Sequence, residues 1–244
     1  DSKRLKKKAL LKINGRTTID HLIKRIKLSK KIDDIILCTT KNKIDNRLVK
    51  IAKKNNIKFF RGASNDVLKR IIMCLKKIKN VGTVIRITGD DILVDPSYID
   101  KSIFTHLKIN ADYTSSKNLP SGTEVEVFSY KTLKLIYNFA EDTSGSEYLT
   151  NYIKDNKDFF KIANTNIKKT HRLKYRLTID SHEDFFIVKK LLEYMKKINK
   201  EYSYTIEDIK NFFKKFPKIS KINKNIIQRK MPLKFNSNIK WSET

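Results

Sequence analysis

The segment Gly82-Thr-Val-Ile-Arg-Ile-Thr-Gly-Asp-Asp91 decides the fold class of this chain. Its residues 82–88 are mainly β-branched and apolar, which is typical of a buried strand. The strand stops abruptly at Gly89, and the carboxylates of Asp90 and Asp91 follow it directly. Ligands of open α/β sheets bind beyond the carboxyl ends of the strands. The segment therefore predicts an α/β protein with a ligand site near Asp90.

Strands and helices alternate on both sides of this segment. Apolar or alternating patterns predict strands at 34–40, 57–60, 112–115, 123–128 and 174–179. Apolar residues at helical spacing predict helices at 17–30, 47–55, 66–79, 96–110, 130–140 and 147–155. Ser181-His-Glu-Asp184 and Thr205-Ile-Glu-Asp208 have the spacing of a capping box, which predicts two further helix starts. The alternation predicts a Rossmann-like, doubly wound and mainly parallel sheet.

The length of 244 residues favours one α/β domain, which we place at residues 1–223. Residues 224–244 are rich in Lys and Asn with little periodicity, so we expect a tail there. No apolar run is long enough to span a bilayer, and no apolar signal segment opens the chain. Cys38 and Cys74 show no metal-binding or redox spacing. These features predict a soluble protein with free thiols in a reducing cytoplasm.

The formal net charge of +28 raises the question of nucleic acid as a partner. The charge comes overwhelmingly from lysine, and the lysines are dispersed over the expected helices, as Lys24, Lys53 and Lys189 illustrate. Nucleic-acid recognition favours arginine, and clustered aromatic residues beside the charge. Nucleic acid is therefore not predicted as the main partner, and the positive field is expected to attract small anionic substrates.

A second predicted strand also ends in an acidic residue. Arg176-Leu-Thr-Ile-Asp180 leads into an expected helix, so Asp90 and Asp180 should meet at one edge of the sheet. Two carboxylates there are suitable hard ligands for magnesium, completed by water and substrate phosphates. Gly89 would let the backbone approach a ligand closely. Asp at such junctions can instead cap a helix or form a turn; we favour the turn for Asp91, and capping stays open for Asp180.

The opening stretch Asp1-Ser-Lys-Arg-Leu-Lys-Lys-Lys8 offers a hydroxyl and several cations before an expected helix. The hydroxyl of Ser2 and the cations of Arg4, Lys6, Lys7 and Lys8 would suit a polyphosphate, although an ordinary solvated basic terminus is the alternative. No phosphate-binding P-loop, no dinucleotide glycine motif and no His or Cys in triad spacing is present. Walker-type NTPases, dinucleotide enzymes and triad hydrolases are therefore not supported.

Several short motifs follow one another along the chain in a family-like order. Ser2, Arg4 and Lys8 fit the second half of the loop A-R-x-x-S-x-R-L-P-G-K-x-L, with Lys6 and Lys7 in place of Pro-Gly. Further matches are Phe60-Arg-Gly to Arg70, Arg86-Ile-Thr-Gly-Asp90 to Pro96, Pro120-Ser-Gly to Phe128, and Arg176 to Asp184. In this order the segments resemble the cytidylyltransferases that activate sugar acids, especially the spore-coat-polysaccharide branch, related to the acylneuraminate and 3-deoxy-manno-octulosonate cytidylyltransferases.

The resemblance has two departures. The family begins with a strand that carries Ala-Arg, so we expect the first strand of the sheet to be missing here. The family motif R-E-H-V-T becomes Ser146-Glu-Tyr-Leu-Thr150, without its Arg and His. The second change leaves the acceptor's identity open.

The resemblance implies a reaction in which an acceptor oxygen attacks the α-phosphorus of CTP and releases pyrophosphate. Phosphoryl-type transfer depends on positioning and charge neutralisation. It implies that Asp90 and Asp180 hold Mg²⁺, with Asp90 also catalytic. Arg4 and Lys8 would be catalytic and neutralise the phosphates, and Ser2, Thr39 and Gly89 would complete the nucleotide site. Arg70 and Glu126 would serve the acceptor, a small anionic sugar acid.

The same resemblance implies a role in surface polysaccharide biosynthesis and a homodimer, which is common in the family. A helix-surface charge and an outward strand residue remain the alternatives for Arg70 and Glu126. Three other functions also stay open. These are a transferase of the same fold with another nucleotide or a UDP-sugar donor, a non-catalytic basic binding protein, and a catalytically impaired fragment.

Overall fold

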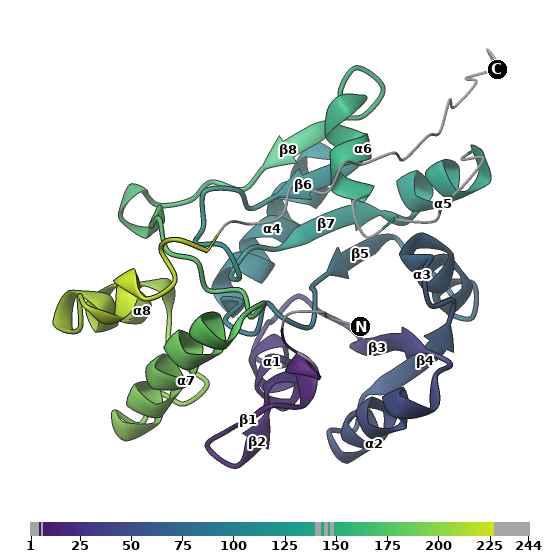
Figure 1. Cartoon of the computed structure of the whole chain (residues 1–244). Coiled ribbons are helices and arrows are strands. Elements are labelled where there is room, and N and C mark those ends of the chain that lie inside the picture. The colour runs from purple at the N-terminus through teal and green to yellow at the C-terminus, as the bar shows by residue number, and fades with distance from the viewer. Residues whose placement is uncertain (1–4, 6, 140–142, 144–145, 147–148, 227–244) are drawn as a thin grey trace.

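The computed structural model describes residues 5, 7–139, 143, 146 and 149–226 as an α/β fold (Figure 1). The helices are α1 Thr18–Ile26, α2 Asn46–Lys54, α3 Val67–Leu75, α4 Pro96–Ile109, α5 Tyr130–Phe139, α6 Leu149–Asp155, α7 His182–Lys197 and α8 Ile206–Lys215. The strands are β1 Lys12–Ile13, β2 Arg16–Thr17, β3 Ile36–Thr40, β4 Lys58–Gly62, β5 Thr83–Arg86, β6 Tyr113–Ser115, β7 Glu126–Ser129 and β8 Ile162–Asn164. The predicted helix starts at Ser181 and Thr205 are confirmed as capping boxes.

The described strands form sheets of mixed kind. β3 and β4 pair in parallel, with Cys38 opposite Phe60. A four-stranded sheet has the order β5-β7-β6-β8, in which β6 and β8 are parallel but β7 runs antiparallel to both of its neighbours. The α/β class is confirmed. Of the mainly parallel pairing that was predicted, β3–β4 and β6–β8 are parallel, while β7 runs antiparallel to β5 and β6. β3 and β5 belong to separate sheets within the described residues.

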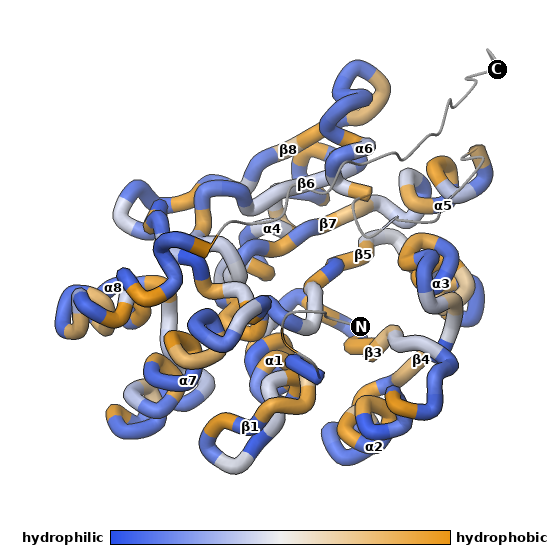
Figure 2. Tube along the Cα trace, viewed as in Figure 1, coloured by the Kyte–Doolittle hydropathy of each residue, from blue (hydrophilic) through white to orange (hydrophobic). Residues whose placement is uncertain are grey.

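Helices cover these sheets in layers (Figure 1). α4 packs on β6, β7 and β8, and α2 and α3 pack on β3 and β4. Along each helix hydrophobic and hydrophilic residues alternate with the turns, as Figure 2 shows, so each can bury one side. One hydrophobic cluster joins α1, α7 and α8 to the fully buried residues Ile92, Leu93 and Val94. The loop that follows Asp90, residues 91–95, is therefore anchored by packing of its apolar side chains in the main core.

Arg25 on α1 is a buried residue, 1% exposed, that is hydrogen-bonded to this loop. Its Nε donates to the carbonyl of Val94 at 3.1 Å, and its Nη1 donates to the carbonyls of Tyr202 and Tyr204. The carboxylate of Asp95 in turn accepts from the backbone N–H of Ile206, at 3.0 Å. Nε and Nη1 of Arg25 and the carboxylate of Asp95 are hydrogen-bonded, as buried polar groups usually are. These bonds tie the loop after Asp90 to the start of α8.

The predicted strand at 174–179 is wrong as a regular strand. The segment forms only an isolated bridge between Arg176 and Ser121. Its N–H groups pair with loops instead, Leu177 with the carbonyl of Ser121 at 2.7 Å and Ile179 with the carbonyl of Asp90 at 3.1 Å. The side chains of Leu177 and Ile179 are nevertheless buried. The apolar pattern thus predicted the burial of this segment correctly. Its backbone N–H groups, however, bond to two different loops and not to one neighbouring strand, so no ladder forms.

Gly122 permits this close approach of two backbones. Its φ is +92°, and a Cβ there would lie 2.2 Å from the N of Thr178 and 2.4 Å from the carbonyl carbon of Leu177. We expect Gly122→Ala to lower the free energy of unfolding by about 2 kcal/mol or more, because the new methyl group clashes with backbone and φ is strained. Denaturant unfolding checks this. Gly82→Ala, where a Cβ meets nothing within 4 Å, is the control and should change little.

Candidate active site

Lys8 lies between two carboxylates that are far away in the sequence. Its Nζ donates to Oδ2 of Asp90 at 2.5 Å and to Oδ1 of Asp180 at 2.8 Å. The three side chains are between 20% and 23% exposed, so the cluster is sheltered but reachable from solvent. The structure therefore brings together Asp90 and Asp180 (the carboxylate pair), as predicted, and adds Lys8 between them.

Local backbone geometry places the carboxylate pair. Asp90 follows β5 in a turn that is closed by the N–H of Asp91 donating to the carbonyl of Thr88 at 3.1 Å. The hydroxyl of Thr88 donates to Oδ2 of Asp91 at 2.6 Å, so the turn role predicted for Asp91 is confirmed. Asp180 directly precedes α7, but the side chain that caps this helix is that of Ser181. Capping, which was left open for Asp180, is therefore not its role.

A network of three side chains, of which Asp184 and Asn223 are buried, supports Asp180 on the side away from Lys8. Arg176 donates from Nη2 to Asp180 at 2.8 Å and from Nε to Asp184 at 3.1 Å. Asp184 is fully buried, and it also accepts from the backbone N–H of Ser181 and, at 2.8 Å, from the amide of Asn223. We call Arg176, Asp184 and Asn223 the supporting network. From the sequence, Asp184 was expected only to cap α7 and Arg176 was only part of a family motif, while Asn223 was not singled out.

The charges in the site shift its pKa values. Although burial opposes their charged forms, the carboxylates of Asp90 and Asp180 raise the pKa of Lys8, and Lys8 and Arg176 lower the pKa of Asp180. Each opposite charge stabilises the ionised form of its neighbour. The ammonium and the Asp180 carboxylate are therefore both charged at neutral pH.

A further acidic face adjoins the carboxylate pair. Val125 and Val127 are buried in the core, so Glu126 at the start of β7 and Glu124 two residues before it face the other side of the chain. Burial and the charge of Asp90 raise the pKa of Asp91 to about 7. Glu124 is exposed at the surface, yet surrounding protein, and then the carboxylates of Asp91 and Glu126, raise its pKa to about 7. Such shifts are typical of functional sites, and sequence analysis did not anticipate Glu124.

Glu126 is held by partners from three elements. It pairs with Nη1 of Arg86 on β5 at 3.1 Å, and it accepts from the hydroxyls of Tyr113 at 3.4 Å and of Thr150 on α6. Its side chain is 25% exposed. It is therefore not a freely solvated strand residue, and it follows Glu124 by two residues at the start of β7.

Arg70 and Thr39 lie among structural partners. Nη1 of Arg70 donates to the carbonyl of Ala63 at 2.6 Å, and a Cβ added at Gly62 would lie 2.9 Å from Cγ of Arg70. Gly62 and Arg70 of the motif from Phe60 to Arg70 therefore lie against each other where β4 meets α3. Thr39 is buried and donates its hydroxyl to Asp45 at 2.8 Å. Substrate roles for Arg70 and Thr39 stay predictions, as does that of Gly89.

A model of the cytidylyltransferase family matches residues 1–227. The chain belongs to this family. As a cytidylyltransferase-family member it is a nucleotidyltransferase by class. The family resemblance stated from the sequence motifs is thereby confirmed.

Known relatives and a solved structure agree with this family. A cytidylyltransferase from Leptospira borgpetersenii superposes with a TM-score of 0.83 at 28% identity, covering 93% of this chain and 94% of its own. The spore coat polysaccharide biosynthesis protein SpsF of Bacillus subtilis is 30% identical over 79% of this chain and 82% of its own length. An uncharacterized protein of Methanocaldococcus jannaschii is 37% identical over 93% of this chain and 92% of its own length. The described part of the chain has no helix that is both long and apolar enough to span a membrane.

The segment that departs from the family motif has structural uses in this cytidylyltransferase. Ser146 accepts from the N–H of Leu68 at 2.8 Å and donates to Asp66, which caps α3. Thr150, which keeps the Thr of the motif, donates to Glu126. Both ends of the altered motif therefore connect to residues of other family motifs. Ser2 and Arg4 lie outside the described residues.

The residues of the site fit a magnesium ion that is shared with substrate. In the part of the chain that the structure describes, no three His, Cys, Asp or Glu side chains are arranged to hold a metal by themselves. The carboxylate pair supplies two hard oxygen donors that already share one cation, the Lys8 ammonium. Magnesium in proteins is usually held by one or two carboxylates together with water and substrate phosphates. The carboxylate pair matches that donor set.

Proposed function

We propose that this protein transfers CMP from CTP to a small anionic sugar acid, with Mg²⁺ and with release of pyrophosphate. The observation that carries the proposal is the carboxylate pair, bridged by Lys8, in a chain that belongs to the cytidylyltransferase family. The similarity to a spore coat polysaccharide protein supports a role in surface polysaccharide biosynthesis. A cytoplasmic homodimer is part of the same proposal.

In this reaction the protein mainly positions the two substrates and neutralises the charge of the phosphates. When bound, Mg²⁺ would neutralise part of the triphosphate charge and orient the α-phosphate. Asp90 and Asp180 would hold it, and the supporting network keeps Asp180 aimed at the site. Lys8, and Arg4 from the same stretch, would bind the β- and γ-phosphates and stabilise the pyrophosphate as it leaves.

The acceptor is proposed to lie toward Glu126 and Glu124, on the acidic face beside the carboxylate pair. Arg86 already neutralises Glu126, at 3.1 Å. Carboxylates there can accept hydrogen bonds from sugar hydroxyl groups. Glu124, whose pKa is raised to about 7, can also take a proton near neutral pH, as a group close to the attacking hydroxyl should.

A pyrophosphate-release assay tests the proposal. Purified protein is incubated with Mg²⁺, each of CTP, ATP, GTP and UTP, and a panel of sugar acids and neutral sugars. We expect release only with CTP and a sugar acid, and none when the metal is chelated. Thermal-shift measurements with UDP-sugars serve as the counter-test. Preferential stabilisation by a UDP-sugar would point to a glycosyltransferase instead.

A further inference from the structure

The Lys8 ammonium occupies the position between Asp90 and Asp180 where a shared cation would lie. It is 2.5 Å from one carboxylate and 2.8 Å from the other. We propose that Lys8 is an internal cation that keeps the carboxylate pair closed to free divalent metal until a triphosphate draws the ammonium away. This inference rests on the proposed function, because it assumes that the pair is the metal site.

The positive charges that already contact the carboxylate pair support the proposal that Lys8 competes with a divalent metal. Both carboxylates contact Lys8, and the second oxygen of Asp180 also accepts from Arg176 at 2.8 Å. Two cationic side chains therefore contact the carboxylate pair before any metal arrives, Lys8 directly between the two carboxylates and Arg176 shared with Asp184. A divalent cation entering alone would have to displace Lys8 into solvent or lie beside two like charges, and both options are unfavourable in a sheltered site.

The backbone of Lys8 is anchored while its side chain can swing. The hydroxyl of Thr18 donates to the carbonyl of Lys8 at 2.6 Å, and the N–H of Thr18 donates to the carbonyl of Leu11 at 2.8 Å. The lysine side chain is a flexible four-carbon stem with a point charge at its end. A triphosphate next to the site offers that charge a new anionic partner. Lys8 can thus exchange the carboxylates for phosphates without movement of the backbone.

Loading of metal and nucleotide is coupled as a result. The triphosphate that removes Lys8 also brings oxygen ligands for the metal, so each favours the binding of the other. Coupling of this kind is reciprocal. The metal is expected to bind weakly in the absence of nucleotide, which distinguishes this arrangement from a resident metal site.

Manganese binding to the nucleotide-free protein, measured by electron paramagnetic resonance, tests the inference. We expect Lys8→Met to bind Mn²⁺ about tenfold more tightly than the wild type, or more, because the competing charge is gone. Lys8→Arg keeps a cation and should bind as weakly as the wild type. Lys12→Met, which removes an exposed lysine of β1, is the matched control and should change nothing. Adding Asp90→Asn to Lys8→Met should abolish the gain.

A Lys8→Met protein that binds Mn²⁺ no more tightly than the wild type would overturn the inference, as would a gain that survives Asp90→Asn. Failure of the proposed function would look different. In that case CTP and sugar acids would give no pyrophosphate, whatever the metal affinity of the Lys8 variants. The two results come from separate measurements on the same preparations.

Discussion

Asp90→Asn is expected to reduce pyrophosphate release from CTP by about a hundredfold to a thousandfold, which is typical of losing one strong electrostatic contact in a transition state. The side chain keeps its shape and can still accept a hydrogen bond from Lys8. Its charge is lost, however, and with it half of the charge of the carboxylate pair. Steady-state turnover at saturating CTP measures the effect. Because the change is nearly isosteric at a side chain that is 20% exposed, the unfolding midpoint should move little.

The matched control is Asp33→Asn. Asp33 is an exposed carboxylate in the loop between α1 and β3, and it belongs to neither the carboxylate pair nor the acidic face. It should leave turnover and stability unchanged. Turnover by Asp90→Asn within twofold of the wild type would mean that Asp90 does not act at the metal, and the site would have to be reassigned.

Asp184→Ala is expected to lower the free energy of unfolding by about 3–5 kcal/mol, as is typical when one partner of a buried ion pair is removed. Asp184 is fully buried, and its loss leaves the guanidinium of Arg176 and the amide of Asn223 without this shared acceptor. It also removes the acceptor for the N–H groups of Asp180 and Ser181 at the start of α7. Guanidinium-chloride unfolding followed by circular dichroism measures the change.

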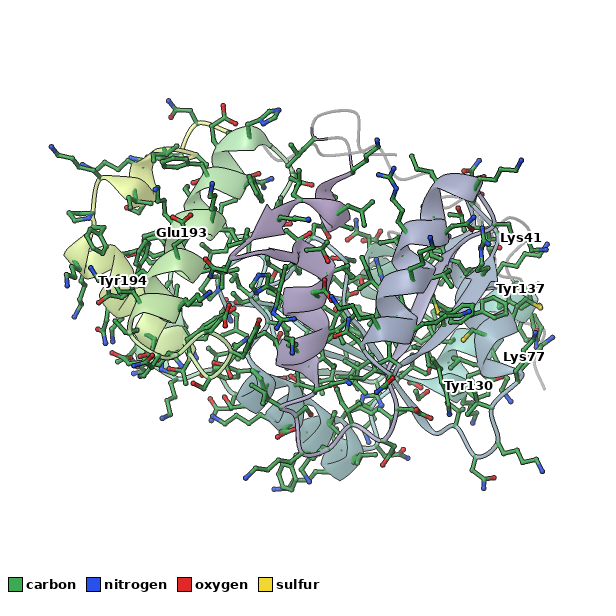
Figure 3. The ribbon with its side chains drawn as sticks, turned by 90° about the horizontal axis from the view of Figure 1, so that it is seen from below. Lys41, Lys77, Tyr130, Tyr137, Glu193 and Tyr194 are labelled. Atoms are coloured by element: carbon green, nitrogen blue, oxygen red, sulfur yellow. The ribbon has the colours of Figure 1, made fainter. Side chains whose placement is uncertain are left out.

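The same helix provides a control for Asp184. Glu193→Ala removes a partly exposed carboxylate of α7 that pairs with Lys189 and Lys190 on the helix surface, and it should change stability by less than about 1 kcal/mol (Figure 3). Asp184→Asn keeps the hydrogen-bonding shape and should recover part of the stability. An Asp184→Ala protein as stable as Glu193→Ala would show that the supporting network does not hold the start of α7.

Local sequence patterns predicted most of the helices and strands, because the interactions that start a helix join residues close together in the sequence. Thr17, Ser181 and Thr205 cap helices because their side chains reach the N–H three residues later. β8 was not predicted, since three residues carry too little pattern. The segment 174–179 has the composition of a strand, but whether it forms a ladder depends on which backbone lies beside it. That neighbour is the loop around Gly122, far away in the sequence.

The candidate site was predicted only in part, because some of its contacts join residues that are far apart in the sequence. Strand-end position suggested that Asp90 and Asp180 meet, and the family motif suggested Lys8, but only as a phosphate ligand. That Lys8 lies between the carboxylates depends on contacts across 82 and 172 residues, which no spacing rule reports. The raised pKa of Glu124 likewise comes mainly from surrounding protein and from the carboxylate of Asp91, which lies far away in the sequence. Arg176 was quoted as part of a motif, yet its bond to Asp184 appears only in the folded chain.

The amide of Asn223 reaches back to the carbonyl of Arg176 at 2.9 Å and to Asp184 at 2.8 Å, so the last part of the domain completes the site that the first part begins. During synthesis the N-terminal parts of a domain emerge first. Lys8 and Asp90 leave the ribosome early, but Asp180 gains its final support only after residue 223 has been made. If the carboxylate pair is the metal site, as proposed, a nascent chain would carry that site unfinished until residue 223 is made.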